Sequence, residues 1–86
     1  MTDKKPLTAR VTVMLKDGVL DPQGRAIEQA LHTLGFSNAA DVRVGKIIEV
    51  QLSQTDPELA KSEAEEMARK LLANQVIERF HVEIAA

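Results

Sequence analysis

Lys16-Asp17-Gly18-Val19-Leu20-Asp21-Pro22-Gln23-Gly24-Arg25 connects two segments of different periodicity. Before it, the alternating apolar residues Val11, Val13 and Leu15 predict a strand with one buried face. After it, apolar residues recur at helical spacing and predict a helix; they are Ile27, Ala30, Leu31 and Leu34. The segment is therefore interpreted as a strand-to-helix connection, and we expect the fold to be organised around it.

The connection carries the signals of a turn and of a helix start. Asp17-Gly18 favours a turn, because glycine tolerates a positive φ. Asp21 can accept hydrogen bonds from free amides of the helix, and Pro22 suits the first helical position because it has no N–H. Gly24 is harder to explain, since a glycine in a helix costs about 1 kcal/mol relative to alanine. Either the connection has only ordinary start signals, or another backbone or a ligand approaches Gly24 closely.

Length and composition restrict the class of protein. The 86 residues predict one domain, residues 1–86, whose own core is small, so oligomerisation is expected. There is no cysteine, which excludes disulfides and thiolate sites. A net charge of −2 and only two aromatic residues disfavour a nucleic-acid partner. The sequence has no run of about 20 apolar residues and no apolar signal-peptide core, so we expect no membrane partner and a cytoplasmic protein. Residues 1–7 are expected to be a flexible tail.

The expected elements follow the order β-α-β-α-β. The first helix should end at a left-handed Gly35, with Phe36 packed beneath its end. The second helix should begin at Asp56-Pro57 and carry ion pairs of i,i+4 spacing, Glu65 with Arg69 and Glu66 with Lys70. In chain order the elements cover about residues 8–16, 22–34, 41–52, 57–72 and 76–84.

The second strand contains a conflict at Lys46. This residue has the same parity as Ile48 and Val50, and strict alternation would bury its ammonium group at high cost. A bulge or sharp bend at Gly45-Lys46 would relieve the conflict. The alternative is a hairpin turn that divides the segment into two strands and gives the ferredoxin-like order β-α-β-β-α-β. We favour one long bent strand, because residues 41–44 are few for a strand.

These elements predict an α+β fold. It is a small antiparallel sheet with two helices on one face, a ferredoxin-like variant with a long bent second strand. The opposite face, which carries Met14, has no element left to cover it. We expect a second copy of the chain to pack there, so that the protein is a homodimer or a larger oligomer.

No set of residues with catalytic or metal-binding spacing is present. His32 and His81 lie on different expected elements, and neither has a carboxylate pair placed as metal ligands would be. The serines lack an adjacent base. The spacing from Gly18 to Gly24 matches no phosphate-binding pattern. We therefore expect no catalytic, cofactor-binding or metal-binding residue in this chain.

Two polar or glycine-rich patches are the candidate functional sites. Both present backbone groups and charge, as a partner interface does; the alternative is that they only shape the domain. The first patch comprises Lys16, Asp17, Gly18, Asp21, Gln23 and Gly24, and the second Arg43, Gly45 and Lys46.

Three strings together resemble one protein family over nearly the whole chain, from Arg10 to Ile84. They are Lys16-Asp17-Gly18-Val19-Leu20-Asp21-Pro22-Gln23-Gly24, Ala30-Leu31-His32-Thr33-Leu34-Gly35-Phe36 and Asp41-Val42-Arg43-Val44-Gly45-Lys46. The family is the small subunit of phosphoribosylformylglycinamidine synthase, or formylglycinamide ribonucleotide amidotransferase. This chain departs from the family at two places. The family often has proline where this chain has Asp17, and Asn-Pro where it has Asn74-Gln75. Both differences affect local turn geometry.

The resemblance implies a function in purine biosynthesis. In that family the small subunit is not the catalyst; it is oligomeric and joins a glutaminase subunit to a large synthase subunit. The complex uses ATP, Mg and glutamine to make formylglycinamidine ribonucleotide, and the small subunit is implied to aid ammonia transfer. The chain itself would then bind no cofactor. The competing class is a small regulatory domain that senses an amino acid or a nucleotide, which saturable binding by the purified chain would reveal.

Overall fold

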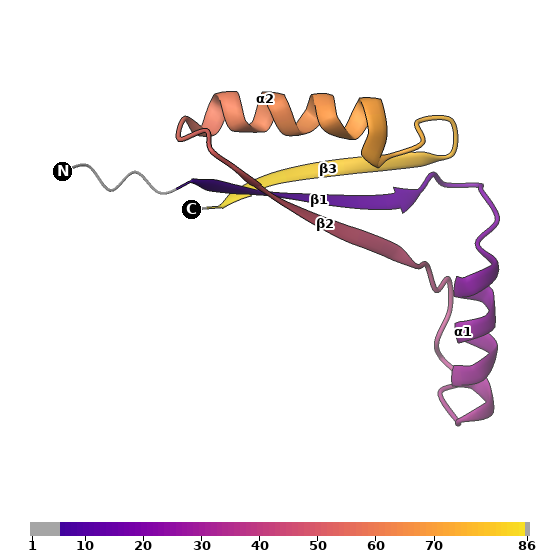
Figure 1. The fold of residues 1–86 in the computed structure, drawn as a ribbon. Coiled ribbons are helices and arrows are strands. Elements are labelled where there is room, and N and C mark those ends of the chain that lie inside the picture. The colour runs from indigo at the N-terminus through magenta and orange to yellow at the C-terminus, as the bar shows by residue number, and fades with distance from the viewer. Residues whose placement is uncertain (1–5, 86) are drawn as a thin grey trace.

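The computed structural model describes residues 6–85, which form a three-stranded antiparallel sheet of order β2-β1-β3 and two helices (Figure 1). The elements are β1 (Leu7–Leu15), α1 (Pro22–Thr33), β2 (Gly45–Leu52), α2 (Pro57–Met67), a π-helical turn η1 (Ala68–Leu72) and β3 (Glu78–Ala85). The predicted α+β class is confirmed. Leu7 is buried within β1, so the expected tail was too long at that end; residues 1–5 of the tail lie outside the described residues.

The core lies between β1 and α2. Alternate residues of β1 point towards α2, and Ala9, Val11 and Val13 are at most 1% exposed. Ala60, Ala64 and Ala68 face them at helical spacing and are equally buried. These small side chains let the helix approach the sheet closely. α2 covers the sheet because it joins β2 to β3, two parallel strands on either side of β1, and such strands need a crossover connection.

α1 does not cover the sheet, so the expectation of two helices on one face is wrong for the single chain. β1 and β2 are antiparallel neighbours, and α1 lies in the hairpin connection between them. Antiparallel neighbours need no crossover over the face of the sheet. The helix instead projects away from the end of the sheet (Figure 1). Phe36, which was expected to pack beneath the helix end, is 56% exposed, so that expectation is also wrong. We call residues 22–44, which comprise α1 and the segment returning to β2, the α1 lobe.

β2 is neither bent nor divided. It begins at Gly45, four residues later than expected, and its register with β1 runs unbroken from Leu7↔Leu52 to Met14↔Gly45. Lys46 lies opposite Val13 on the face that bears α2, and it is nevertheless exposed. The reason is that α2 lies mainly over β1 and β3. The face is open at Lys46, so no bulge is needed to keep the charge in water.

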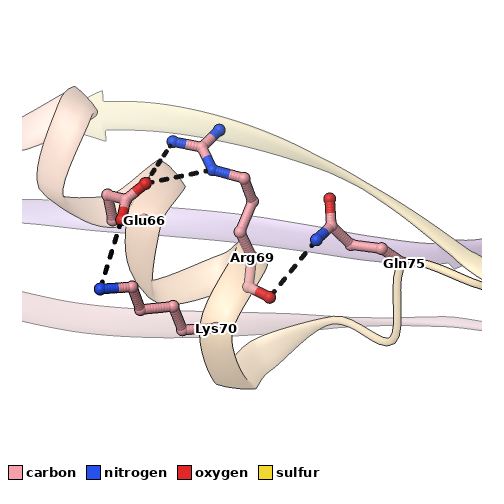
Figure 2. Close-up of polar contacts among 4 residues, drawn as sticks. All are labelled: Glu66, Arg69, Lys70 and Gln75. Atoms are coloured by element: carbon pink, nitrogen blue, oxygen red, sulfur yellow. Dashed lines mark hydrogen bonds and ion pairs between the residues drawn. The ribbon is translucent and has the colours of Figure 1, made fainter.

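The expected ion pair of Glu66 in α2 with Lys70 in η1 is confirmed, whereas Arg69 is paired differently from expectation. Glu66 accepts hydrogen bonds from Arg69 at 2.9 Å and forms an ion pair with Lys70 at 3.5 Å, whereas the expected partner of Arg69 was Glu65 (Figure 2). Residues at i,i+3 and i,i+4 are both neighbours on a helix surface. These bonds, that of Arg69 first, lower the pKa of Glu66. Ala73 donates to the Ala68 carbonyl at 3.0 Å and closes the π-helical turn.

The sheet face opposite α2 is polar and is not covered by any element of the described chain. Arg10 and Glu49 form an ion pair of 2.8 Å across β1 and β2 on this face. Met14 is half-buried, and the side chain of Ile47 is 61% exposed. The packing of a second copy on this face stays a prediction.

Candidate partner interface

Asp21 holds the base of the α1 lobe together. It is the N-cap of α1, and its Oδ1 accepts a hydrogen bond from the Gly24 amide at 2.9 Å. Its Oδ2 accepts a second bond, of 2.8 Å, from the amide of Val44 at the entry to β2. The side chain is buried, with 9% exposure. One carboxylate thus connects the two ends of the hairpin connection, a role beyond the helix cap that the sequence predicts.

Gly24 is the point at which the returning segment touches α1. A Cβ atom built on Gly24 would overlap the carbonyl group of Val42. Close approach of another backbone was one of the two interpretations of this glycine, and it is confirmed. The contact explains why a residue of low helix propensity occupies the first turn of the helix.

Arg43 ties the returning segment to the exit of β1. Its guanidinium donates to the carbonyls of Leu15 at 3.3 Å, Lys16 at 3.1 Å and Val19 at 3.2 Å. The two predicted patches are therefore joined through this residue. We call Asp21, Gly24, Arg43 and Val44 the clamp, because together they fix the direction in which the α1 lobe leaves the sheet.

The other predicted residues lie around the clamp and are exposed. Gly18 has a φ of +86°, which confirms the turn expected at Asp17-Gly18. Asp17 lies 4.0 Å from Arg79 of β3. The remaining exposed members of the two patches are Lys16, Gln23, Gly45 and Lys46. The predicted patches thus divide into a clamp with a structural role and an exposed rim that can meet a partner.

A cleft of about 620 Å³ opens between the first patch and the α1 lobe. Its walls carry both signs of charge, with Arg25 and Arg43 on one hand and Glu28 and Asp41 on the other. Among residues 6–85 no three His, Cys, Asp or Glu side chains are grouped as ligands of a metal ion. Such a mixed, open surface is typical of the polar rim of a protein interface.

Two residues of the lobe were not anticipated as part of the site. Glu28 accepts a hydrogen bond from the Val42 amide at 3.4 Å, and Nε2 of His32 lies 2.7 Å from the carbonyl oxygen of Ala39. Both hold the returning segment against α1. Each interacts with the backbone of a distant residue, and a side-chain pattern gives no signal for such a partner.

The two hydrogen bonds to the Asp21 carboxylate predict that the stability of the α1 lobe depends on pH. Hydrogen bonds from Val44 and Gly24, with a smaller effect of Arg43, hold the pKa of Asp21 below its usual value. A depressed pKa contributes stability above the unfolded-state value of about 3.9 that is lost as the pH falls through the folded-state value. We expect Asp21→Asn to lower Tm at pH 7 by roughly 5 °C or more, because an amide nitrogen would face the Val44 amide. Thermal melts between pH 7 and pH 2 should show this difference shrinking below pH 4.

Asp56→Asn is the matched control. Asp56 is also an N-cap before a proline, but its side chain accepts only from Glu58 within its own helix. Asparagine caps as well as aspartate, so Tm at pH 7 should barely change. Equal Tm losses in the two variants would show that Asp21 acts as a cap alone.

The fold and the site define a small α+β domain with a clamp and an exposed rim at one end of its sheet. Within residues 6–85 no helix is long and apolar enough to cross a membrane.

Comparison with known proteins identifies the family. Residues 8–86 match the PurS family, described as phosphoribosylformylglycinamidine (FGAM) synthase. The PurS subunit of FGAM synthase from Methanocaldococcus jannaschii is 43% identical over 76 residues, which cover 88% of this chain and 92% of that protein. The Bacillus subtilis PurS subunit is 44% identical over 75 residues, which cover 87% and 88%. The chain therefore belongs to the PurS family.

Solved structures agree with this assignment. The crystal structure of M. jannaschii PurS, a subunit of formylglycinamide ribonucleotide amidotransferase in the purine biosynthetic pathway, has a TM-score of 0.82 at 42% identity. The alignment covers 92% of this chain and 95% of that one. The PurS structure from Thermus thermophilus has a TM-score of 0.83 at 36% identity and covers 94% and 96%. Family membership favours a subunit of this enzyme over a regulatory ligand-binding domain.

Proposed function

We propose that this chain is the non-catalytic small subunit of a phosphoribosylformylglycinamidine synthase complex in purine biosynthesis. It brings a glutaminase subunit and a large synthase subunit together and aids the transfer of ammonia between them. The complex is a cytoplasmic C–N ligase that uses ATP, Mg and glutamine, none of which this chain binds itself. The chain associates with itself, as a dimer or a larger oligomer.

The observation that carries this proposal is the clamp with its exposed rim. Asp21 and Arg43 use buried or backbone-directed bonds to hold a loop rich in charge and glycine in one conformation. A preorganised surface loses less conformational entropy when a partner binds. Nothing in the mixed-charge cleft resembles a nucleophile with its base. Such an arrangement suits recognition of another subunit better than chemistry on a substrate.

The proposal is tested by measuring synthase activity of the two catalytic subunits with and without this chain. With glutamine as nitrogen donor, formation of formylglycinamidine ribonucleotide should require the chain. With free ammonia in place of glutamine, the large subunit alone should react at an undiminished rate, because no subunit then has to deliver ammonia. If the chain changes neither rate, it does not join these subunits.

Lys46→Glu tests the exposed rim within the same assay. The Lys46 side chain is exposed, so its replacement should leave Tm and the circular dichroism spectrum unchanged. Reversal of its charge should weaken assembly roughly threefold to tenfold, seen as a higher concentration of this chain needed for half-maximal glutamine-dependent activity. Lys61→Glu, on the exposed side of α2, is the charge-matched control. Equal effects of the two reversals would exclude Lys46 from the interface.

A further inference from the structure

The sheet face opposite α2 has a small pocket where β1 and β3 lie side by side, near the end from which the α1 lobe leaves. Its volume is about 330 Å³, and the residues that line it are Thr12, Met14, Arg79, Phe80 and His81. Thr12 and Met14 belong to β1, and the other three belong to β3. The volume lies at the lower end of the range for sites that hold a small molecule, so the pocket has room for a small metabolite.

The strand register brings three hydrogen-bond donors to this pocket. His81 lies directly opposite Thr12 in the pairing of β1 with β3, and Arg79 lies opposite Met14, the next residue of β1 on the same face. Directly opposite residues have Cβ atoms about 5 Å apart, and alternate residues of one strand are about 7 Å apart. The hydroxyl of Thr12, the ring of His81 and the guanidinium of Arg79 can therefore reach one bound group.

The two basic side chains are not fully engaged within the chain. Arg79 makes one ion pair among residues 6–85, a long contact of 4.0 Å with Asp17, whose side chain is 94% exposed. None of the ion pairs within the described residues involves His81. The guanidinium and the imidazole are thus left for an acceptor from outside the chain.

The charge and the number of donors indicate the class of ligand. No acidic side chain lines this pocket, unlike the mixed-charge cleft at the α1 lobe, and Glu83 lies opposite Arg10, outside the lining. A guanidinium offers two parallel N–H donors that fit two oxygens of one anion. A carboxylate has no third oxygen for the remaining donors, whereas a phosphoryl group has one. The pocket therefore suits a phosphoryl group better than a carboxylate.

We propose that this pocket binds the phosphate of a small phosphate monoester, which accepts hydrogen bonds from Arg79, His81 and Thr12. The side chain of Met14 supplies an apolar wall on which the organic part of the ligand, such as a sugar ring, can pack. The inference goes beyond the proposed function, because it gives a small-molecule ligand to a chain that otherwise acts through its partner subunits. It uses none of the four clamp residues.

The test is a titration of the purified, isotope-labelled chain with ribose 5-phosphate, followed by NMR at constant ionic strength. The amides of Thr12, Arg79 and His81 should shift saturably, with a Kd on the order of 1 mM for so small a ligand. Inorganic phosphate should shift the same amides with roughly threefold weaker affinity or less, because it has no sugar to contact Met14. Ribose without phosphate should shift none of them.

Arg79→Gln should weaken the binding of ribose 5-phosphate roughly fivefold or more, because it removes a charged donor. Arg79 is exposed, so the circular dichroism spectrum should not change. Arg10→Gln is the matched control, because it removes the same charge from the same sheet face outside the pocket, and the affinity should stay within about twofold. Thr12→Val removes a donor without changing the charge and should weaken binding about threefold.

The proposal would be overturned by shifts that do not saturate, by equal affinities of the Arg79 and Arg10 variants, or by ribose 5-phosphate binding no tighter than inorganic phosphate. Shifts that follow the protein concentration and not the ligand concentration would mean that another copy of the chain covers the pocket, which would also overturn it. None of these results depends on synthase activity, so this site and the proposed function can fail independently.

Discussion

Gly24→Ala is expected to destabilise the protein, although alanine is the better helix former. In an unconstrained helix this replacement would stabilise by about 1 kcal/mol. Here the added Cβ meets the carbonyl of Val42, a backbone group that cannot rotate away. Overpacking of this kind costs about 1–3 kcal/mol, so the sign of the effect reverses. Tm should fall, and the amides of Val42 and Val44 should exchange with solvent faster as the returning segment separates from α1.

Gln23→Ala is the control for Gly24→Ala. Gln23 occupies the adjacent position in the first turn and is exposed, so alanine adds no contact there. It should leave Tm unchanged or raise it slightly. If Gly24→Ala also raised Tm, the returning segment would be free to move, and the clamp would not fix the direction of the lobe.

The local structure around the connection could be predicted well, because its signals are short-range. Asp21 and Pro22 start α1 as their chemistry requires, and Gly35 ends it with a φ of +100°. The alternation of β1 identified which side chains are buried. These features depend on neighbours within about four residues, and the sequence contains those neighbours.

The placement of α1 could not be predicted in the same way. An apolar stripe such as Ile27 and Leu34 indicates that one side of a helix packs against another surface. It does not indicate whether that surface belongs to the same chain. The order β-α-β is compatible with a crossover between parallel strands and with a hairpin that contains a helix. Only the antiparallel pairing of β1 with β2 distinguishes them, and pairing is a long-range property.

The error at Lys46 has the same origin. Its parity implies burial only if a helix covers the whole face, and α2 covers mainly β1 and β3. At the candidate site the special positions could be predicted, but their interaction partners could not. Asp21 and Gly24 were chosen correctly as special positions, but their partners, the amide of Val44 and the carbonyl of Val42, are backbone groups about 20 residues away. Any residue type supplies such groups, so the composition of the partner segment holds no signal.

The clamp and the core have different structural roles. The core of β1 and α2 supplies the stability of the single chain, whereas the clamp positions a lobe that contributes little to that core. A change in the clamp should alter both Tm and assembly, because the clamp fixes the lobe that carries the exposed rim. A change under α2 should act mainly on unfolding, and the row of Ala60, Ala64 and Ala68 is where this can be measured most clearly.

Ala64→Leu is expected to have the largest effect on unfolding. Ala64 is 1% exposed at the middle of the row, where α2 meets the sheet, and three extra carbons can be accommodated only if the helix moves away. Such overpacking costs about 1–3 kcal/mol, and each kcal/mol lowers Tm by about 4–8 °C in a domain of this size. Ser62→Leu places the same side chain on the exposed side of α2 and should leave Tm within about 2 °C of the original. Urea denaturation of both variants at equal protein concentration provides the comparison. A stability loss at Ser62 equal to that at Ala64 would mean that the helix packs on the sheet differently from this structure.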